Sequence, residues 1–552
     1  MATLKVAVIM LITVAVYGAD ERSAAVDKVF EAFSKPDSPG CAVAIVQDGR
    51  VVHSKAYGLA SLEHEVPLTT SSVFMISSTT KQFTGFAVQL LRSRGKLSLD
   101  DSVRKYIPEL PASFGAMTLN HLLHHTSGIP QYSALRALGL SLPPLPSPQD
   151  LVQALSRLRS LNFELGEEYG YSNEDYTLLG IVVSRVTGMP LSEFARREIF
   201  EPLGMNSTLY MDSAAPVIKH RATNYARKSD GTFELSSEEW LGNAAGTSER
   251  VPDGGIGVLS TVEDFIRWDL NFTEAKLGGR EVFDAMEVDG TLNTGQPVGY
   301  GSGLVLGNYR GLRTVGHTGL GHGNRSLYMR FPDQRLSVVV LCNLPDVSRI
   351  PDRLYEIYLK DQLKDAASPK ESAPPPALIS LSAGQLERFE GTYWNKPRRA
   401  IVRVYVSGGG LRVSSETSGD SLWRPVSESE FRRETNLQDR IVFQGNRLLN
   451  PAVWEKVDLV SPSGDALSEY SGDWYSPDLD VKYQFAVKDG RLHWSQPANA
   501  SGYDLTQFVR DQFHSSSADF EFKRNSSGKI VELDVSLSRA RNIKFERVDA
   551  RH

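Results

Sequence analysis

The chain has 552 residues, of which 41% are hydrophobic and 23% are charged, and its formal net charge is −6. This composition is that of an ordinary globular protein, and the length is enough for about two to four domains. The mild acidity argues against a nucleic-acid partner, which would require a basic surface stripe. Beyond the N-terminus, no stretch approaches the ~18 consecutive apolar residues of a membrane-spanning helix.

The first residues have the pattern of a secretory signal peptide. A single charge, Lys5, precedes an apolar run from Val6 to Val16, and small residues follow up to Ala19. This run is too short to span a bilayer comfortably, which argues against a membrane anchor. We therefore expect residues 1–19 to be removed and the protein to be secreted or periplasmic. Loss of Lys5 would take the net charge from −6 to −7.

A short helix and two strands are expected next. A helical pattern runs from Ala25 to Phe33, and the β-rich runs 40–46 and 51–57 flank the turn signal Asp48-Gly49. The two runs predict a hairpin that begins a sheet.

A serine and a lysine then stand three residues apart at the start of a long apolar helical pattern, which continues to Leu91. They are Ser78 and Lys81. The i, i+3 spacing places both side chains on one helical face, and a helix N-terminus stabilises negative charge that develops beside it. A serine hydroxyl becomes a good nucleophile only next to a base. The pair therefore predicts a nucleophile with its activator, although a helix cap beside a surface lysine has the same spacing.

The second polar motif is Tyr171-Ser172-Asn173, at the start of another amphipathic helical pattern. A tyrosine beside the serine and lysine can carry a proton between the nucleophile and the leaving group. Asn173 can orient the lysine or a substrate amide. The helical segment from Ser78 to about Leu203 is expected to form one half of the domain.

The third motif is His317-Thr318-Gly319, upstream of the strand-like run 336–342. His317 and Thr318 would line the opposite wall of the site and position the substrate. Gly319 would let the substrate approach the backbone closely, so that the N–H groups of Ser78 and Leu320 form an oxyanion hole.

Together the three motifs resemble those of the serine penicillin-recognising superfamily, which includes D-alanyl-D-alanine carboxypeptidases, class C β-lactamases, related esterases and D-aminopeptidases. The class A form of the set has Ser-Asp-Asn and Lys-Thr-Gly. This chain has Tyr-Ser-Asn and His-Thr-Gly, which resembles the peptidase side and counts against β-lactamase activity. Further family-like stretches are 122–128, 254–261 and 300–304, so the resemblance covers about residues 25–360.

The resemblance implies an α+β fold in which the active site lies between an antiparallel sheet and a helical half. It also bears on the two cysteines, because Cys41 opens the first predicted strand and Cys342 closes the last. In the resembled fold these strands are antiparallel neighbours, and export would permit a disulfide between them. Two buried thiols are equally compatible with the sequence.

Three histidines, His121, His124 and His125, lie close together before the turn 126–128. They have no companion set of carboxylates or cysteines with metal-ligand spacing, so capping and packing are expected of them. Neither a metal nor another cofactor is predicted.

The C-terminal third contains a linker and a duplication. Residues 365–379 begin with a stretch rich in Ala, Ser, Lys, Glu and Pro, which is typical of an extended linker. Beyond it, seven positions recur 81 residues later (467 − 386 = 81): Leu386, Phe389, Gly391, Tyr393, Gly409, Leu411 and Val413 match Leu467, Tyr470, Gly472, Trp474, Gly490, Leu492 and Trp494. Short alternating patterns separated by turn residues predict two small antiparallel β-barrels, at 380–460 and 461–552.

A catalytic domain at 20–364 followed by two barrels resembles the D-aminopeptidases, in which a loop of the second barrel helps to shape the site. The first barrel has the basic loop 395–399, whereas the second has Asp478 and Asp480 at the matching place. Either carboxylate would pair with a substrate ammonium if this loop reaches the cleft. A solvated turn has the same composition.

The sequence therefore predicts an exported serine hydrolase that acts through an acyl-enzyme on a small peptide, amide or ester, most closely resembling a D-aminopeptidase. The alternatives are a D-alanyl-D-alanine carboxypeptidase, an esterase or β-lactamase, and, from another class, a non-catalytic peptide-binding protein.

Overall fold

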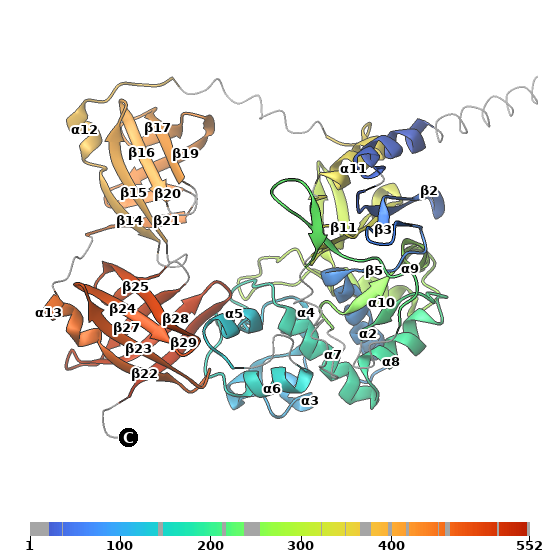
Figure 1. Cartoon of the computed structure of the whole chain (residues 1–552), viewed down its shortest axis with the longest axis horizontal. Coiled ribbons are helices and arrows are strands. Elements are labelled where there is room, and N and C mark those ends of the chain that lie inside the picture. Colours follow the sequence, from blue (N-terminus) through green and yellow to red (C-terminus); the bar gives the residue numbers. More distant parts are fainter. Residues whose placement is uncertain are drawn as a thin grey trace, which may run out of the picture. The chain divides into compact units, whose positions relative to one another are not determined.

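The structure, a computed structural model, describes residues 21–35, 37–141, 147–211, 217–236, 254–321, 323–347, 349–364, 377–395, 400–415, 419–450, 452–458, 464–515 and 518–548. The predicted signal peptide and almost all of the predicted linker lie outside the described residues. The chain divides into two compact units (Figure 1). The first ends at Ala366, and the second holds Leu138–Leu140 with the residues from Ala367 onward.

The first unit is built on an antiparallel sheet with the strand order β10-β11-β12-β13-β1-β2. Its strands are β1 (Cys41–Gln47), β2 (Arg50–Tyr57), β10 (Val305–Tyr309), β11 (Leu312–Gly321), β12 (Asn324–Phe331) and β13 (Leu336–Cys342). The predicted hairpin is β1 and β2. The central pair joins the two ends of the domain, because β1 runs antiparallel to β13 and Cys41 lies opposite Cys342. These two residues form a disulfide.

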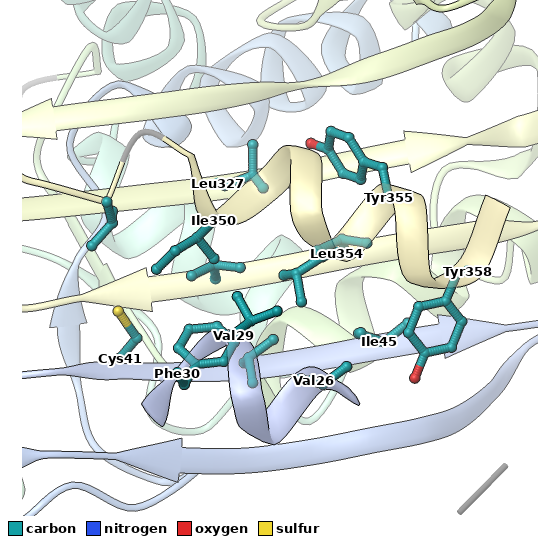
Figure 2. Packing of buried hydrophobic residues seen from close by; sticks show 14 of the residues in the cluster. Val26, Val29, Phe30, Cys41, Ile45, Leu327, Ile350, Leu354, Tyr355 and Tyr358 are labelled. Atoms are coloured by element: carbon teal, nitrogen blue, oxygen red, sulfur yellow. The ribbon is translucent and has the colours of Figure 1, made fainter. Parts of the chain in front are cut away.

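Helices from the two ends of the domain cover one face of this sheet. They are the helix at residues 21–29, followed by the 3₁₀ turn η1 (Glu31–Phe33), and α11 (Ile350–Leu359). Figure 2 shows Phe30 beside the Cys41 end of β1 and Leu354 of α11 over the same strand, and both belong to one buried cluster with Ile45. Burying a side chain of this size contributes roughly 1.5–3 kcal/mol, so the cluster holds both ends of the domain against the sheet.

The helical half contains α2 (Lys81–Ser93), whose residues are buried over most of its length. It contacts α7 (Asn173–Thr187) and α10 (Gly279–Met286), while α9 (Val262–Glu274) lies against β1 and β13. The shorter helices are α3 (Val103–Tyr106), α4 (Leu119–Leu123), α5 (Tyr132–Ala137), α6 (Pro148–Ser156) and α8 (Leu191–Ala195). Within the described ranges, no single helix has the length and apolarity to cross a membrane, although the bent pair Asn173–Thr187 and Leu191–Phe200 passes by length and composition.

Three small sheets complete the first unit. They pair β3 (Leu59–Ser61) with β4 (Val66–Pro67), β7 (Tyr225–Arg227) with β8 (Phe233–Leu235), and β9 (Val258–Ser260) with both β5 (Phe74–Met75) and β6 (Leu209–Tyr210). The last of these leads directly into the turn that carries Ser78.

The second unit contains two closed antiparallel barrels, which confirms the predicted β-barrels (orange and red in Figure 1). The first comprises β14 (Gly391–Asn395), β15 (Ala400–Ser407), β16 (Gly410–Ser415), β17 (Gly419–Pro425), β18 (Glu430–Arg433), β19 (Asn436–Gln444), β20 (Arg447–Asn450) and β21 (Ala452–Val457). The second comprises β22 (Gly472–Ser476), β23 (Val481–Lys488), β24 (Arg491–Gln496), β25 (Asn499–Val509), β26 (Gln512–His514), β27 (Asp519–Arg524), β28 (Ile530–Leu537) and β29 (Ala540–Arg547).

The duplication is visible in matching details of the two barrels. The helices α12 (Ala383–Glu387) and α13 (Gly464–Leu467) precede them at equivalent places. The matched glycines at the first strands, Gly391 and Gly472, have φ of 144° and 129°, a region that L side chains rarely adopt. The two copies therefore preserve a backbone conformation as well as an apolar pattern.

Candidate active site

Ser78 lies in a 3₁₀ turn, η2 (Ser77–Thr80), that leads into α2. Hydroxyl groups on either side of Ser78 fasten this turn to β12. Ser77 donates a hydrogen bond to Asn324 Oδ1 (2.8 Å), and Thr79 Oγ1 lies 2.7 Å from Ser326 Oγ. Ser77 also takes a left-handed backbone conformation, with φ of 47°. The flanking residues thus fix the turn, and the Ser78 side chain is left half-buried.

Lys81 is fully buried, and its ammonium group meets three acceptors. Its Nζ donates to Asn173 Oδ1 (2.7 Å), to the Gly255 carbonyl (3.0 Å) and to Ser78 Oγ (3.4 Å). An ammonium group has three protons to donate, so this set suits the charged form of lysine. The predicted nucleophile and its predicted activator are therefore adjacent in the structure.

Tyr171 and Asn173 reach the same place from the start of α7. Lys81 Nζ lies 4.7 Å from the centre of the Tyr171 ring, within the range of a cation–π contact. Ser172 is the residue before the helix, and Asn173 is the first helical residue. Its side chain accepts from Lys81, which is the contact expected if Asn173 orients the lysine, one of the two roles that the sequence allowed.

His317 lies buried on β11, and its proton positions follow from its partners. Its Nδ1 lies 2.6 Å from the carbonyl of Thr318, which can only accept, so Nδ1 carries a proton. Burial, with a smaller contribution from the Lys81 charge, lowers the pKa of His317 to about 3. The ring is therefore neutral, and its Nε2 accepts a hydrogen bond from the Tyr300 hydroxyl at 2.9 Å.

The rest of the third motif lies along an open stretch of β11. The neighbouring strand β10 pairs only with Leu312 to Gly316, and within the described residues no strand pairs with residues 317–321 on that side. Thr318 lies opposite Leu327, which belongs to the cluster under α11, so its side chain points away from the face that carries His317. Thr318 and Leu320 are both exposed, with Leu320 58% accessible.

The structure shows one close approach at Gly319, while its role in admitting the substrate stays a prediction. A Cβ atom at this position would lie 2.1 Å from the carbonyl oxygen of Ile76, the residue before η2. The close approach is thus made by the protein's own backbone. One residue further, a Cβ at Gly321 would lie 2.8 Å from Ser77 Oγ. Leu320 stands between two glycines that touch the nucleophile turn, a placement compatible with the expected oxyanion pair of Ser78 and Leu320.

A buried polar layer lies behind Tyr171. His125 Nδ1 is 2.8 Å from Asp175 Oδ2, and Ser127 donates to the other carboxylate oxygen at 2.6 Å. The His125 ring centre lies 4.5 Å from that of Tyr171 and 4.7 Å from that of Tyr300. His125 thus contacts both the predicted proton carrier and the partner of His317.

The other two histidines have structural contacts. His121 forms a reciprocal cap with Thr118 at the start of α4, and His124 Nδ1 lies 2.7 Å from the Tyr300 carbonyl. Across the described part of the chain, no group of three or more histidine, cysteine or acidic residues has the arrangement of a metal site.

The two aspartates expected to recognise an amine lie between β22 and β23 of the second barrel. Asp478 is fully buried, whereas Asp480 has φ of 53° and accepts a hydrogen bond from Tyr475 at 2.7 Å. Their role in amine recognition stays a prediction.

Sequence reasoning missed Tyr300, His125 and Asp175 as parts of the site. Tyr300 lies in a family-like stretch to which no role was assigned, and His125 was expected only to cap or pack around the turn 126–128. Asp175 left a clearer signal, because it lies three and four residues before Leu178 and Leu179, on the buried face of the helix. An acidic residue on such a face requires a partner nearby.

Known proteins share this fold and much of this chain. A family model described as Beta-lactamase matches residues 26–359. Penicillin-binding protein 4* of Bacillus subtilis is 29% identical over 321 residues, which make up 57% of this chain and 70% of that protein. A D-aminopeptidase of Brucella anthropi is 24% identical over 537 residues, 92% of this chain and 95% of its own.

Among solved structures, an octameric penicillin-binding protein homologue from Pyrococcus abyssi resembles the chain with a TM-score of 0.52 and 22% identity. The match covers 91% of this chain and 98% of the other. At this identity the likeness concerns the fold alone.

Proposed function

The chain belongs to the Beta-lactamase family and is a serine hydrolase that acts on amide bonds; within that class, we propose that it is an exported peptidase resembling the D-aminopeptidases. The observation that carries the chemistry is the joint placement of Ser78, Lys81 and Tyr171. Support for the substrate class comes from the relatives named D-aminopeptidase, whose match extends over both barrels, and from the neutral state of His317.

In the proposed reaction, Tyr171 in its phenolate form accepts the proton of Ser78 as Oγ attacks the carbonyl carbon. The Lys81 ammonium stabilises the phenolate by charge, and the N–H groups of Ser78 and Leu320 stabilise the oxyanion. Tyr171 then gives the proton to the leaving amine, which departs as the acyl-enzyme forms. Water hydrolyses this ester with Tyr171 again as the base. Asn173 holds Lys81 in place throughout.

His317 supports an amine-terminal substrate over a carboxylate-terminal one. The Lys-Thr-Gly form of the third motif presents a cation at this place, whereas here the ring is neutral, with Nδ1 bonded to the Thr318 carbonyl and Nε2 bonded to Tyr300. A neutral ring whose two nitrogens are both hydrogen-bonded within the protein attracts a substrate carboxylate only weakly. This counts against a D-alanyl-D-alanine carboxypeptidase and is compatible with the amides and peptides that a D-aminopeptidase cleaves.

A hydrolysis panel tests the proposal. It compares D-alanine amides with their L enantiomers, D-alanyl-D-alanine peptides, simple esters and a chromogenic cephalosporin. We expect the D-alanine amides to have the highest kcat/KM, and Ser78→Ala to lower kcat by about 10⁴-fold or more while leaving the fold intact. Preference for D-alanyl-D-alanine peptides would establish the carboxypeptidase instead.

Fluorophosphonate labelling separates an enzyme from a binding protein that has kept the fold. The wild-type protein should be labelled, and Ser78→Ala should not. If neither is labelled and no substrate of the panel turns over, the peptide-binding alternative replaces the hydrolase.

Export is part of the proposal. It is supported by the signal-peptide pattern of residues 1–19 and by the Cys41–Cys342 disulfide, which forms and persists in oxidising compartments. N-terminal sequencing of the protein from its natural host should start after residue 19. A chain that retains Met1 and is recovered from the cytoplasm would contradict export.

A further inference from the structure

Asp175 is a buried carboxyl group that has no lysine or arginine partner among the described residues. It is 0% exposed, and its side-chain contacts are with His125 and Ser127. An ionised carboxylate in such a place is expensive unless a cation is paired with it. The carboxyl group must therefore either give its proton to His125, leaving an ion pair, or keep the proton and remain neutral.

The backbone decides between these two states. The N–H of Ser172 points at His125 Nδ1, at 3.3 Å, the same nitrogen that lies 2.8 Å from Asp175 Oδ2. A nitrogen that faces a backbone N–H carries a lone pair, so the proton shared with Asp175 belongs to the carboxyl group. Burial also raises the pKa of Asp175 well above its ordinary value, an effect that the Ser127 hydrogen bond only partly offsets.

His125 connects this group to the reaction centre. Its backbone is left-handed, with φ of 56°, and its carbonyl accepts from the N–H of Gly170, the residue before Tyr171. Its ring centre lies 4.5 Å from that of Tyr171 at an interplanar angle of 47°. The segment that bears Tyr171 is thus bonded to His125 by its backbone and packed against it by its ring.

We propose that Asp175 is a neutral carboxylic acid that donates its proton to His125 Nδ1, and that the two residues together form a positioning pair for Tyr171. The pair fixes the Tyr171 ring from behind without placing a net charge there. This inference rests on the proposed function, in which Tyr171 is the base. Because the pair is neutral, phenolate formation at Tyr171 depends on the Lys81 ammonium, whose Nζ lies 4.7 Å from the centre of the Tyr171 ring.

The groups that face the pair come from several elements. Lys81 belongs to α2, Glu174 and Tyr176 belong to α7, and the surrounding residues are Ser127, Tyr169, Tyr171 and Tyr300. Of these, Lys81 lowers the pKa of Asp175 and Glu174 raises it. Glu174 is itself engaged, since it accepts from the backbone N–H of Tyr132 and from Ser172.

Two substitutions at Asp175 separate a neutral acid from an ionised one. In Asp175→Asn the amide can donate to His125 Nδ1 and accept from Ser127, which is the hydrogen-bond pattern of a carboxylic acid. We expect kcat within about threefold of wild type and an unchanged acid limb in the pH profile of kcat/KM. Asp175→Ala removes both hydrogen bonds, and we expect kcat to fall by about tenfold or more with KM within about threefold, because Tyr171 acts in the chemical step.

An infrared difference spectrum of wild type minus Asp175→Asn at neutral pH adds a direct readout. It should contain the C=O stretch of a protonated carboxyl group, and it remains informative if Asp175→Ala fails to fold. The proposal is overturned if the spectrum shows a carboxylate, or if Asp175→Asn loses as much activity as Asp175→Ala and shifts the acid limb. Tyr171→Phe tests the proposed proton step separately from the protonation state of Asp175. If this variant kept full turnover, the proposed proton step would fail, while the infrared band would still report the state of Asp175.

Discussion

Removing the cross-link between Cys41 and Cys342 should strongly destabilise the catalytic domain. The two residues face each other at the seam where β1 meets β13, and the bond closes a loop with a sequence separation of 301 residues. In the chain-entropy model, ΔS ≈ −2.1 − 1.5R ln n with n of 301 gives about −19 cal/mol/K, or about 6 kcal/mol at 25 °C. Measured losses are usually smaller, so we expect about 2–5 kcal/mol.

The measurement is chemical denaturation of wild type and of a Cys41→Ala/Cys342→Ala double variant, each with and without dithiothreitol. Catalytic activity and hydrogen exchange of α2 report on the first unit, so that unfolding of the barrels does not obscure it. The reductant should lower the wild-type midpoint toward that of the double variant and leave the double variant unchanged. That difference isolates the cross-link from the packing cost of losing two sulfur atoms. Two titratable thiols in denatured, unreduced wild type would refute the reasoning.

Three further predictions concern the first unit and the second barrel. Because burial raises the pKa of Asp175 in the folded state, wild type loses stability as pH rises above the unfolded value. Asp175→Asn does not titrate and should therefore gain stability relative to wild type over the same pH range, and a constant gap by hydrogen exchange of α7 contradicts this. Gly319→Ala should push β11 away from Ile76 and lower kcat by about a hundredfold. The control Gly115→Ala, where a Cβ meets nothing within 4 Å, should leave kcat unchanged, and equal effects of the two variants would show that the contact between Gly319 and Ile76 does not matter for catalysis. Asp478→Asn or Asp480→Asn should raise KM for substrates with a free amine more than for N-acetylated analogues, and equal changes would remove this loop from substrate selection.

The parts of the site that could be predicted are those in which local spacing fixes the contact. Ser78 and Lys81 meet because they are three residues apart where the turn η2 leads into α2. Asn173 reaches Lys81 because the first turn of α7 carries it there, and the repeat of 81 residues was enough to predict both barrels. In each case a short segment determines the geometry, and chain order supplies the rest.

The parts that could not be predicted depend on how distant segments pack. The hydrogen bond from Tyr300 to His317 requires the turn at residues 299–303 to lie against α2, where a Cβ at Gly303 would lie 2.3 Å from the Lys81 carbonyl. Helical periodicity places Asp175 on a buried face, but it does not identify His125, 50 residues away, as the partner. The sequence likewise indicates that Gly319 allows a close approach without indicating that Ile76 makes it.

The buried groups around the nucleophile share one electrostatic tendency. Burial lowers the pKa of His317, and it raises the pKa of Asp175 and that of Tyr300, so each of the three is shifted toward its neutral form. A negative charge 4 Å away, such as an ionised carboxyl or phenol group, would oppose the formation of a phenolate or an oxyanion by about 4 kcal/mol at an effective dielectric constant of 20. With these neighbours neutral, the Lys81 ammonium dominates the field at Tyr171. Apart from Lys81, the charges at Tyr171 are then those that form on Tyr171 and on the substrate during the reaction.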